Sequence, residues 1–310
     1  MQHTIFVATI ATALLSSSLS VQAQSIRPEP IALPASEFPV PSATLDALIT
    51  AENFTALRAH AWTLWSGVTA DSTQTFKGAV LPIWETWLSE QEVFAPPGVT
   101  LARNAAGGKG TRTAALQSAV APFGSLLAAV KISPDSATFI QAPHETPAGS
   151  GASYSYKSDA DLQRLNDNFD QKNAPVADRK IIDFPAAAID LKVVFLPVKS
   201  SGLSAIPVWN GPQDSTLPDQ PVPSTWKTCV AVDPTNMRAG KAQIDCNGAT
   251  IDAEIVPLNA FYSVPLDPVE AVTVNNLAQL SGNAALVGGD YRVLVAMHIT
   301  SKEIANWTWA

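Results

Sequence analysis

The spacing of hydrophobic positions changes along this chain. In residues 53–66 the apolar side chains recur every three or four positions, which is typical of one face of an amphipathic helix. They are Phe54, Leu57, Ala61, Leu64 and Trp65. Asn53 directly precedes them and belongs to the residue types preferred as helix N-caps. From residue 190 onward the pattern turns to short apolar or alternating runs separated by Pro and Gly.

This change of pattern predicts the elements of the fold. Helices are expected at 53–66, 114–131, 158–169 and 275–280. Strands are expected at 80–87, 190–198, 205–209, 226–232, 241–246, 249–255, 258–264 and 293–299. Because helices dominate first and strands follow in a run, we expect an α+β fold. In it, a helical N-terminal part packs on a β-rich C-terminal part, which forms an antiparallel sheet or a sandwich.

The strand expected at 293–299 contains a long apolar run and a single histidine, His298. Side chains alternate between the two faces of a strand, so His298 is expected on the same face as Arg292 and Thr300. One interpretation is that His298 looks into a cleft lined by these two residues. The other is a core histidine whose two ring nitrogens are satisfied by neighbours.

The N-terminal residues predict export. Residues 5–19 are apolar or small, and Val-Gln-Ala at 21–23 fits a signal-peptide cleavage site, although no Lys or Arg precedes the apolar run. Residues 24–42 contain five prolines and are expected to form an extended arm, leaving 43–310 as one α+β domain. No other stretch reaches the roughly 18 apolar residues of a membrane span. The protein is therefore expected in the periplasm or outside the cell.

Charge and cysteine content narrow the classes of function. The formal net charge is −8, and a chain with this charge and no basic run is expected to bind nucleic acid poorly. Cys229 and Cys246 are the two cysteines, and in an oxidising compartment they are expected to form a disulfide. No second cysteine pair or nearby histidine accompanies them, so neither a metal site nor another cofactor is expected.

The tryptophans suggest one function and the few ionisable candidates another. Trp84 and Trp87 fall on an expected strand, and Trp307 and Trp309 alternate, which places both rings on one sheet face. Such a face stacks on sugars or flat apolar ligands, but the same residues also fill cores. The first hypothesis is a binding module that uses this Trp-lined face for a small ligand or a protein partner. The alternative is a hydrolase-like enzyme with His298 and Glu85 as acid and base.

The last fifteen residues also carry a resemblance. Met-His-Ile at 297–299, Lys302 and Trp-x-Trp-Ala at 307–310 are similar to a signature of a group of secreted bacterial proteins. The pairs Trp62–Trp65 and Trp84–Trp87 resemble its N-terminal landmarks. In that group aromatic residues continue past Trp-x-Trp-Ala. The resemblance implies no activity, fold or catalytic residue, but it implies a C-terminally truncated copy of a longer domain.

Overall fold

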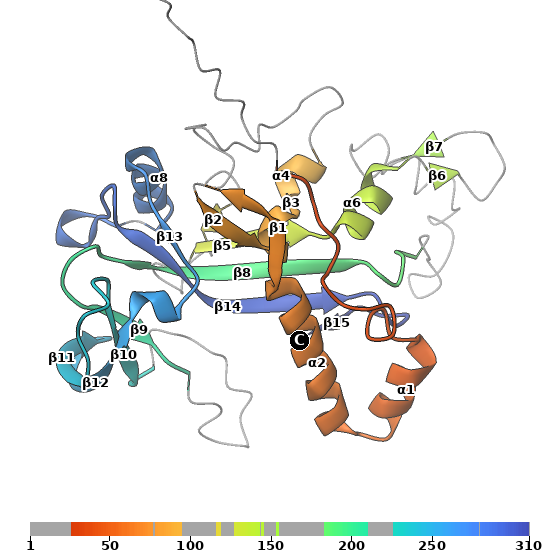
Figure 1. Ribbon diagram of the computed structural model, residues 1–310, viewed down its shortest axis with the longest axis horizontal. Coiled ribbons are helices and arrows are strands. Elements are labelled where there is room, and N and C mark those ends of the chain that lie inside the picture. The colour runs from red at the N-terminus through yellow and green to blue at the C-terminus, as the bar shows by residue number, and fades with distance from the viewer. Residues whose placement is uncertain are drawn as a thin grey trace, which may run out of the picture.

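The computed structural model describes most of the chain from residue 26 onward. The described residues are 26–76, 78–94, 116–118, 127–142, 144–145, 153–154, 183–209, 226–278 and 280–309. The expected signal peptide and the helix expected near 158–169 lie outside them. The fold is α+β, with helices mostly in the N-terminal region and largely antiparallel sheets in the C-terminal region (Figure 1).

A seven-stranded antiparallel sheet forms the centre of the molecule. Its main path runs through β13 (Ser263–Pro265), β14 (Tyr291–Ser301), β8 (Ile189–Val198), β5 (Leu127–Ile132) and β3 (Leu88–Ser89). In addition, β15 (Thr308–Trp309) pairs with β14, and β4 (Leu116–Ser118) pairs with β5. The two longest strands, β8 and β14, lie side by side across the middle of the molecule (Figure 1). They correspond to the strands expected at 190–198 and 293–299.

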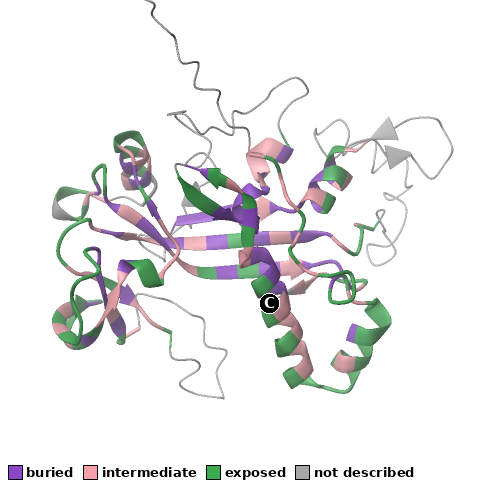
Figure 2. Ribbon diagram, viewed as in Figure 1, coloured by how far each residue is buried: buried purple, intermediate pink, exposed green. Residues whose placement is uncertain are grey.

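The inner face of this sheet carries the main core. Leu191, Val193 and Phe195 of β8 point into it with Met297 and Ile299 of β14, and all five are buried. Helix α2 (Phe54–Thr69), the one-turn helix α3 (Ile83–Thr86) and helix α8 (Pro268–Ala278) contribute the opposing side chains. Figure 2 shows that buried residues concentrate along the sheet, whereas α1 (Ser42–Thr50) and the far side of α2 are exposed. The core therefore lies between the central sheet and these helices.

The outer face is covered at its two ends. At one end, β9 (Ser204–Pro207), β10 (Cys229–Asp233), β11 (Lys241–Cys246) and β12 (Ala249–Pro257) form a second sheet, in which β10 and β12 run parallel. Val232 and Ile206 of that sheet pack with Val198 and Val293 of the central sheet. At the other end, α6 (Pro134–Gln141) and α4 (Glu90–Val93) pack against Ile132. The middle of β8 is left partly open, and Lys192 is exposed there.

The expected disulfide is present. Cys229 and Cys246 are bonded, with their Cα atoms 5.9 Å apart. Both are buried, and the bond links β10 to β11 even though β12 lies between these strands in the sheet. The disulfide is compatible with an extracellular location.

From residue 26 to α1 the Pro-rich arm has no helix or strand, and it contains a turn in which the Glu37 N–H donates to the carbonyl of Pro34. It docks along the body of the protein. The indole N–H of Trp87 donates to the carbonyl of Glu29 at 2.7 Å, and the Glu29 N–H donates to Thr86 Oγ1 at 2.9 Å. Further along, the Ala32 N–H donates to the carbonyl of Gly67. A side chain at Gly67 would clash with the arm, because an added Cβ would lie 2.5 Å from Leu33 Cγ. Glycine here permits close approach of the arm to α2.

Several sequence predictions are accurate at this level. Asn53 caps α2 by accepting from the Ala56 N–H at 3.2 Å, and the helix continues to Thr69. The strand expected at 241–246 coincides with β11, and those at 205–209, 226–232 and 249–255 overlap β9, β10 and β12.

Other predicted elements are wrong. The strand expected at 80–87 ends early as β2 (Ala79–Pro82), which pairs with β1 (Asp71–Phe76), and the chain then turns into α3. The Thr86 hydroxyl closes this turn by donating to the carbonyl of Ile83 at 2.7 Å. Of the helix expected at 114–131, the described residues form β4 and β5 instead, because pairing with β8 overrides the helical propensity of Leu and Ala.

The last elements differ mainly in their bounds. The strand expected at 258–264 is a short 3₁₀ helix, η3 (Leu258–Ala260), followed by β13. The helix expected at 275–280 starts earlier, as α8, and a second 3₁₀ turn, η4 (Gly282–Ala284), follows it. A two-residue pair, β6 (His144–Glu145) with β7 (Ser153–Tyr154), completes the described elements.

Candidate ligand pocket

A β-bulge in β14 decides where its polar residues point. Leu294 pairs with Phe195 and Ala296 pairs with Val194, so Val295 is the extra residue. Before the bulge, even-numbered residues face inward; after it, odd-numbered residues such as Met297 face inward. A strict alternation through the whole strand, as expected from the sequence, is therefore wrong.

As a result, Arg292 and His298 lie on opposite faces of the sheet. His298 is exposed on the outer face, where it pairs with the exposed Lys192. Thr300, on the same face, donates its hydroxyl to the carbonyl of Asp190 at 3.0 Å. The expected cleft that would join His298 to Arg292 does not form, and the core-histidine interpretation is also wrong, since the side chain is exposed.

Glu85, the other member of the proposed acid–base pair, lies on the opposite side of the central sheet from His298. Glu85 belongs to α3, whose neighbouring residues Ile83 and Trp84 are in the core on the inner face. Glu85 itself is buried, with 8% of its surface exposed. Since His298 projects from the outer face, the sheet separates the two residues.

The four tryptophans expected to line a binding face do not form one. Trp84 and Trp87 are core residues with 2% and 0% exposed surface. Trp307 is half-buried against Phe184, with ring centroids 5.3 Å apart, and the side chain of Trp309 lies outside what the structure describes. The most exposed tryptophan of the described chain is Trp62 on α2, at 68%, which meets Trp65 edge-on.

A pocket does lie on the inner side of the sheet, near Trp84. It has a volume of about 130 Å³. The β1–β2 hairpin, β13 with the residue before it, and α8 supply its walls. The lining residues are Phe76, Ala79, Val80, Leu81, Tyr262, Ser263, Val264, Pro265 and Glu270. The lining residue Tyr262 packs edge-on against Trp84, with ring centroids 5.4 Å apart. Trp84, which the sequence suggested as a ligand-binding residue, therefore lies behind Tyr262 and does not line the pocket.

Arg292 lies beside this pocket, at the level of the sheet. It pairs with the pocket residue Val264 across β13 and β14, and paired residues in an antiparallel sheet point to the same side. Its guanidinium carbon sits 5.2 Å from the centroid of the Phe195 ring. The residue is 3% exposed, and its Nε has no hydrogen-bond partner. Burial lowers the pKa of Arg292, while the nearby Glu270 and Tyr262 favour its charged form.

Glu270 is held in place by the start of α8. Its Oε2 accepts from the Asp267 N–H at 2.9 Å, and Asp267 Oδ1 accepts from the Glu270 N–H at 2.8 Å. This reciprocal pair is a capping box at the helix N-terminus. The carboxylate is thus fixed on the pocket wall, while within the described residues no ion pair with Arg292 forms at 4.0 Å or less.

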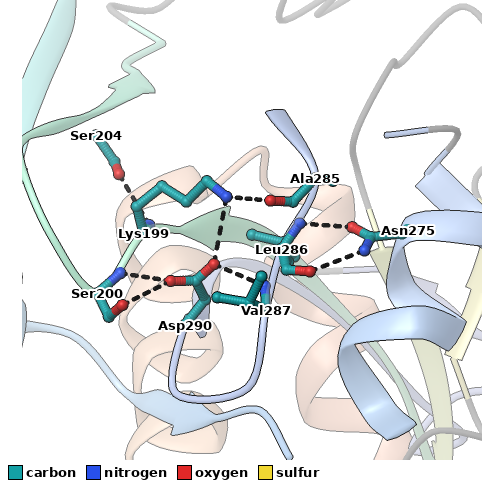
Figure 3. Close-up of polar contacts among 8 residues, drawn as sticks. All are labelled: Lys199, Ser200, Ser204, Asn275, Ala285, Leu286, Val287 and Asp290. Atoms are coloured by element: carbon teal, nitrogen blue, oxygen red, sulfur yellow. Dashed lines mark hydrogen bonds and ion pairs between the residues drawn. The ribbon is translucent and has the colours of Figure 1, made fainter. Parts of the chain in front are cut away.

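Hydrogen bonds anchor the segment between α8, which carries Glu270, and β14, which carries Arg292 (Figure 3). Asp290 Oδ1 accepts from the N–H and the hydroxyl of Ser200 at 2.7 and 2.8 Å, and Oδ2 accepts from the Val287 N–H at 2.9 Å. Desolvation opposes ionisation of Asp290, but these hydrogen bonds and Lys199 together lower its pKa. Lys199 also donates to the carbonyl of Ala285.

Helix α8 is tied to the same segment. The side chain of Asn275 accepts from the Leu286 N–H at 2.7 Å and donates to its carbonyl at 2.9 Å (Figure 3). The Asn275 side chain therefore makes the two hydrogen bonds to Leu286 that the backbone of a neighbouring strand would make. Through it, the helix that carries Glu270 and the strand that carries Arg292 are fixed to each other.

Sequence reasoning missed this pocket because three distant segments build it. One signal was present: an arginine directly before the apolar run of a strand expected to be buried. Buried arginines are rare unless they are paired, so Arg292 itself marks a position that needs an explanation.

Other classes of site find no support in the described part of the chain. It contains no group of three or more His, Cys, Asp and Glu residues that could hold a metal ion. Nor does any helix in the described ranges have the length and apolar character to cross a membrane. Comparisons of the chain with protein families, with curated proteins and with solved structures gave no match.

Proposed function

We propose that this protein is an exported binding module that holds a small molecule in the pocket beside Arg292. The observation that carries the proposal is the state of Arg292, a 3% exposed guanidinium whose Nε makes no hydrogen bond. Burying a cation costs several kcal/mol unless a counter-charge and hydrogen bonds compensate for it. Glu270 supplies a counter-charge at a distance but no ion pair, and a ligand that carries an anionic group would add a closer one.

The character of the pocket supports the same function. Its walls are mostly apolar, from Phe76, Val80, Leu81 and Val264, with a few polar groups from Tyr262 and Glu270. This combination of an apolar lining with a few fixed polar groups is typical of small-molecule sites. A volume of about 130 Å³ favours a ligand of only a few heavy atoms.

Export is supported by two independent features. The residues at 1–23 have the pattern of a signal peptide, and the Cys229–Cys246 bond is of a kind that persists in oxidising compartments. The hydrolase-like alternative has less support, because the central sheet separates His298 from Glu85.

The test is a thermal-shift screen of small carboxylates, amino acids and neutral alcohols against three forms of the protein. At least one probe is expected to raise the Tm of the wild type and of R238M but not of R292M. Arg238 is exposed, which makes R238M a control for loss of a positive charge. Because Nε of Arg292 lacks a hydrogen bond, R292M should fold with an unchanged or higher Tm.

Two results would overturn the proposal. One is a panel in which no probe raises the Tm of the wild type. The other is a ligand-dependent shift of equal size in R292M and in the wild type.

A further inference from the structure

We propose that the ligand of this pocket is a zwitterion with a small apolar body, such as an aliphatic α-amino acid. This inference rests on the proposed function and narrows it to one chemical class. The ligand ammonium group would pair with Glu270 on the pocket wall, and its carboxylate would point toward Arg292, which lies beside the lining residue Val264.

The charges beside the pocket are opposite in sign and are kept apart. Arg292 comes from β14 and Glu270 from α8, and the loop anchored by Asp290 and Asn275 fixes the two elements. No ion pair forms between Arg292 and Glu270 among the described contacts. Two opposite charges that lie near one cavity and interact at a distance, without an ion pair, are complementary to a molecule with the same two charges.

Charge balance selects between ligand classes. The formal charges of Arg292 and Glu270 sum to zero. A simple carboxylate would leave one net negative charge in a partly desolvated site, and a simple amine would leave one net positive charge. A zwitterion leaves the sum at zero and gives the buried Arg292 and the half-buried Glu270 one partner each, so it adds no uncompensated charge beside a buried cation.

Each end of the site has hydrogen-bonding capacity left. Nε of Arg292 is enclosed and has no partner, so a carboxylate would meet the outer edge of the guanidinium, whose donors form a planar fork that matches it. Glu270 uses Oε2 for the Asp267 N–H, whereas Oε1 accepts no hydrogen bond within the described residues. Oε1 is therefore the acceptor for an ammonium group.

The apolar body has its own surface. Phe76, Val80 and Leu81 come from the β1–β2 hairpin, which faces the charged side formed by β13 and α8. The cavity of about 130 Å³ suits a short branched aliphatic group better than an aromatic ring with its two charged substituents. The inference is thus an aliphatic amino acid of about the size of valine.

Three matched probes test this inference by titration calorimetry. Valine carries both charges, isovalerate has the carboxylate alone, and isobutylamine has the ammonium group alone, all with a similar branched body. Valine is expected to bind the wild type at least tenfold more tightly than either partial probe. R292M and E270Q should each lose at least tenfold in valine affinity, whereas R238M should not.

The E270Q variant retains the capping box, because glutamine can also accept from the Asp267 N–H. Equal affinity for valine and isovalerate, or full valine affinity in E270Q, would overturn the zwitterion while leaving a ligand pocket in place. If valine, isovalerate and isobutylamine all fail to bind, the zwitterion is wrong. The broader screen described above then decides separately whether the pocket binds any small molecule.

Discussion

The imidazole of His60 and the carboxylate of Glu303, which are 243 residues apart in the sequence, meet at 2.8 Å between Nε2 and Oε2. The same carboxylate accepts from the Ser301 hydroxyl at 2.8 Å and from the Val40 N–H at 2.7 Å. Its side chain is fully buried. Glu303 thereby ties together α2, the end of the Pro-rich arm and the segment that follows β14.

Removal of this carboxylate should be costly. E303A would leave the Val40 N–H without its acceptor inside the protein and would remove one of the two partners of the Ser301 hydroxyl, which also lies 2.8 Å from Thr308 Oγ1. We therefore expect a loss of roughly 1–3 kcal/mol in the free energy of unfolding. Urea denaturation measures the loss. R58A, on the exposed side of α2, is the control and should change stability by less than about 0.5 kcal/mol. Equal midpoints for E303A and the wild type would show that the network is not stabilising.

Substitution of Gly67 should dislodge the Pro-rich arm. In G67A the new methyl group would lie 2.5 Å from Leu33 Cγ and 2.8 Å from Ile31 Cγ1, so either the arm or the helix must move. We expect a destabilisation of about 1–3 kcal/mol from this overpacking. Hydrogen exchange should also be faster at the Ala32 N–H, which bonds to Gly67. S66A places alanine on the adjacent exposed position, and it should leave both quantities nearly unchanged.

Reduction of the disulfide should weaken the smaller sheet. The Cys229–Cys246 bond closes a loop with a sequence separation of 17, and a loop of this size contributes about 3 kcal/mol in the chain-entropy model. Unfolding measured with and without a thiol reductant should differ by about this amount. The double variant C229A/C246A should be insensitive to reductant. A reductant effect of the same size in that variant would assign the change to something other than this bond.

Asp190 should make stability fall as the pH rises. Burial raises its pKa from 3.8 to about 6, and the nearby Ser136 hydroxyl offsets only part of that shift. The folded state therefore binds the proton more tightly than the unfolded state. The stabilising effect is complete below pH 3.8 and is lost as the pH rises through about 6. The total is about 3 kcal/mol at 1.36 kcal/mol per pKa unit.

The D190N variant isolates this effect. Its unfolding free energy should lack the wild-type decrease between pH 4 and pH 6.5, about 3 kcal/mol in size. D252N, in which the replaced carboxylate is exposed on β12, should keep the wild-type profile. If D190N and the wild type have parallel profiles, then the carboxyl of Asp190 ionises normally in the folded protein.

Much of the fold was predictable where the decisive interactions are local. Asn53 is adjacent to the helix it caps, and the apolar run of β8 is continuous in the sequence. The disulfide followed from a count of two cysteines. Residues 127–131 show the limit, because their alanines and leucine favour a helix until β8 supplies a strand partner from sixty residues away.

The candidate site was less predictable because nothing local encodes it. The sequence pattern predicted a strand at Trp84 and Trp87, but the Thr86 hydroxyl closes a helical turn there. Both tryptophans are buried in the core. Arg292 was assigned to the face of His298 because the bulge at Val295 has no signature in the run of apolar residues around it. Phe76, Val264 and Glu270 meet at one pocket only through the tertiary structure.

The extra residue in β14 also sets how the strand tolerates mutation. Upstream of Val295 the odd-numbered positions face outward, and downstream the even-numbered ones do. In a saturation mutagenesis library, tolerance of polar residues should therefore reverse its phase at residue 295. Deletion of the Val295 codon would give the whole strand one regular alternation of inward-facing and outward-facing positions. Either Arg292 would then leave the neighbourhood of its pocket, or Met297 and Ile299 would leave the core.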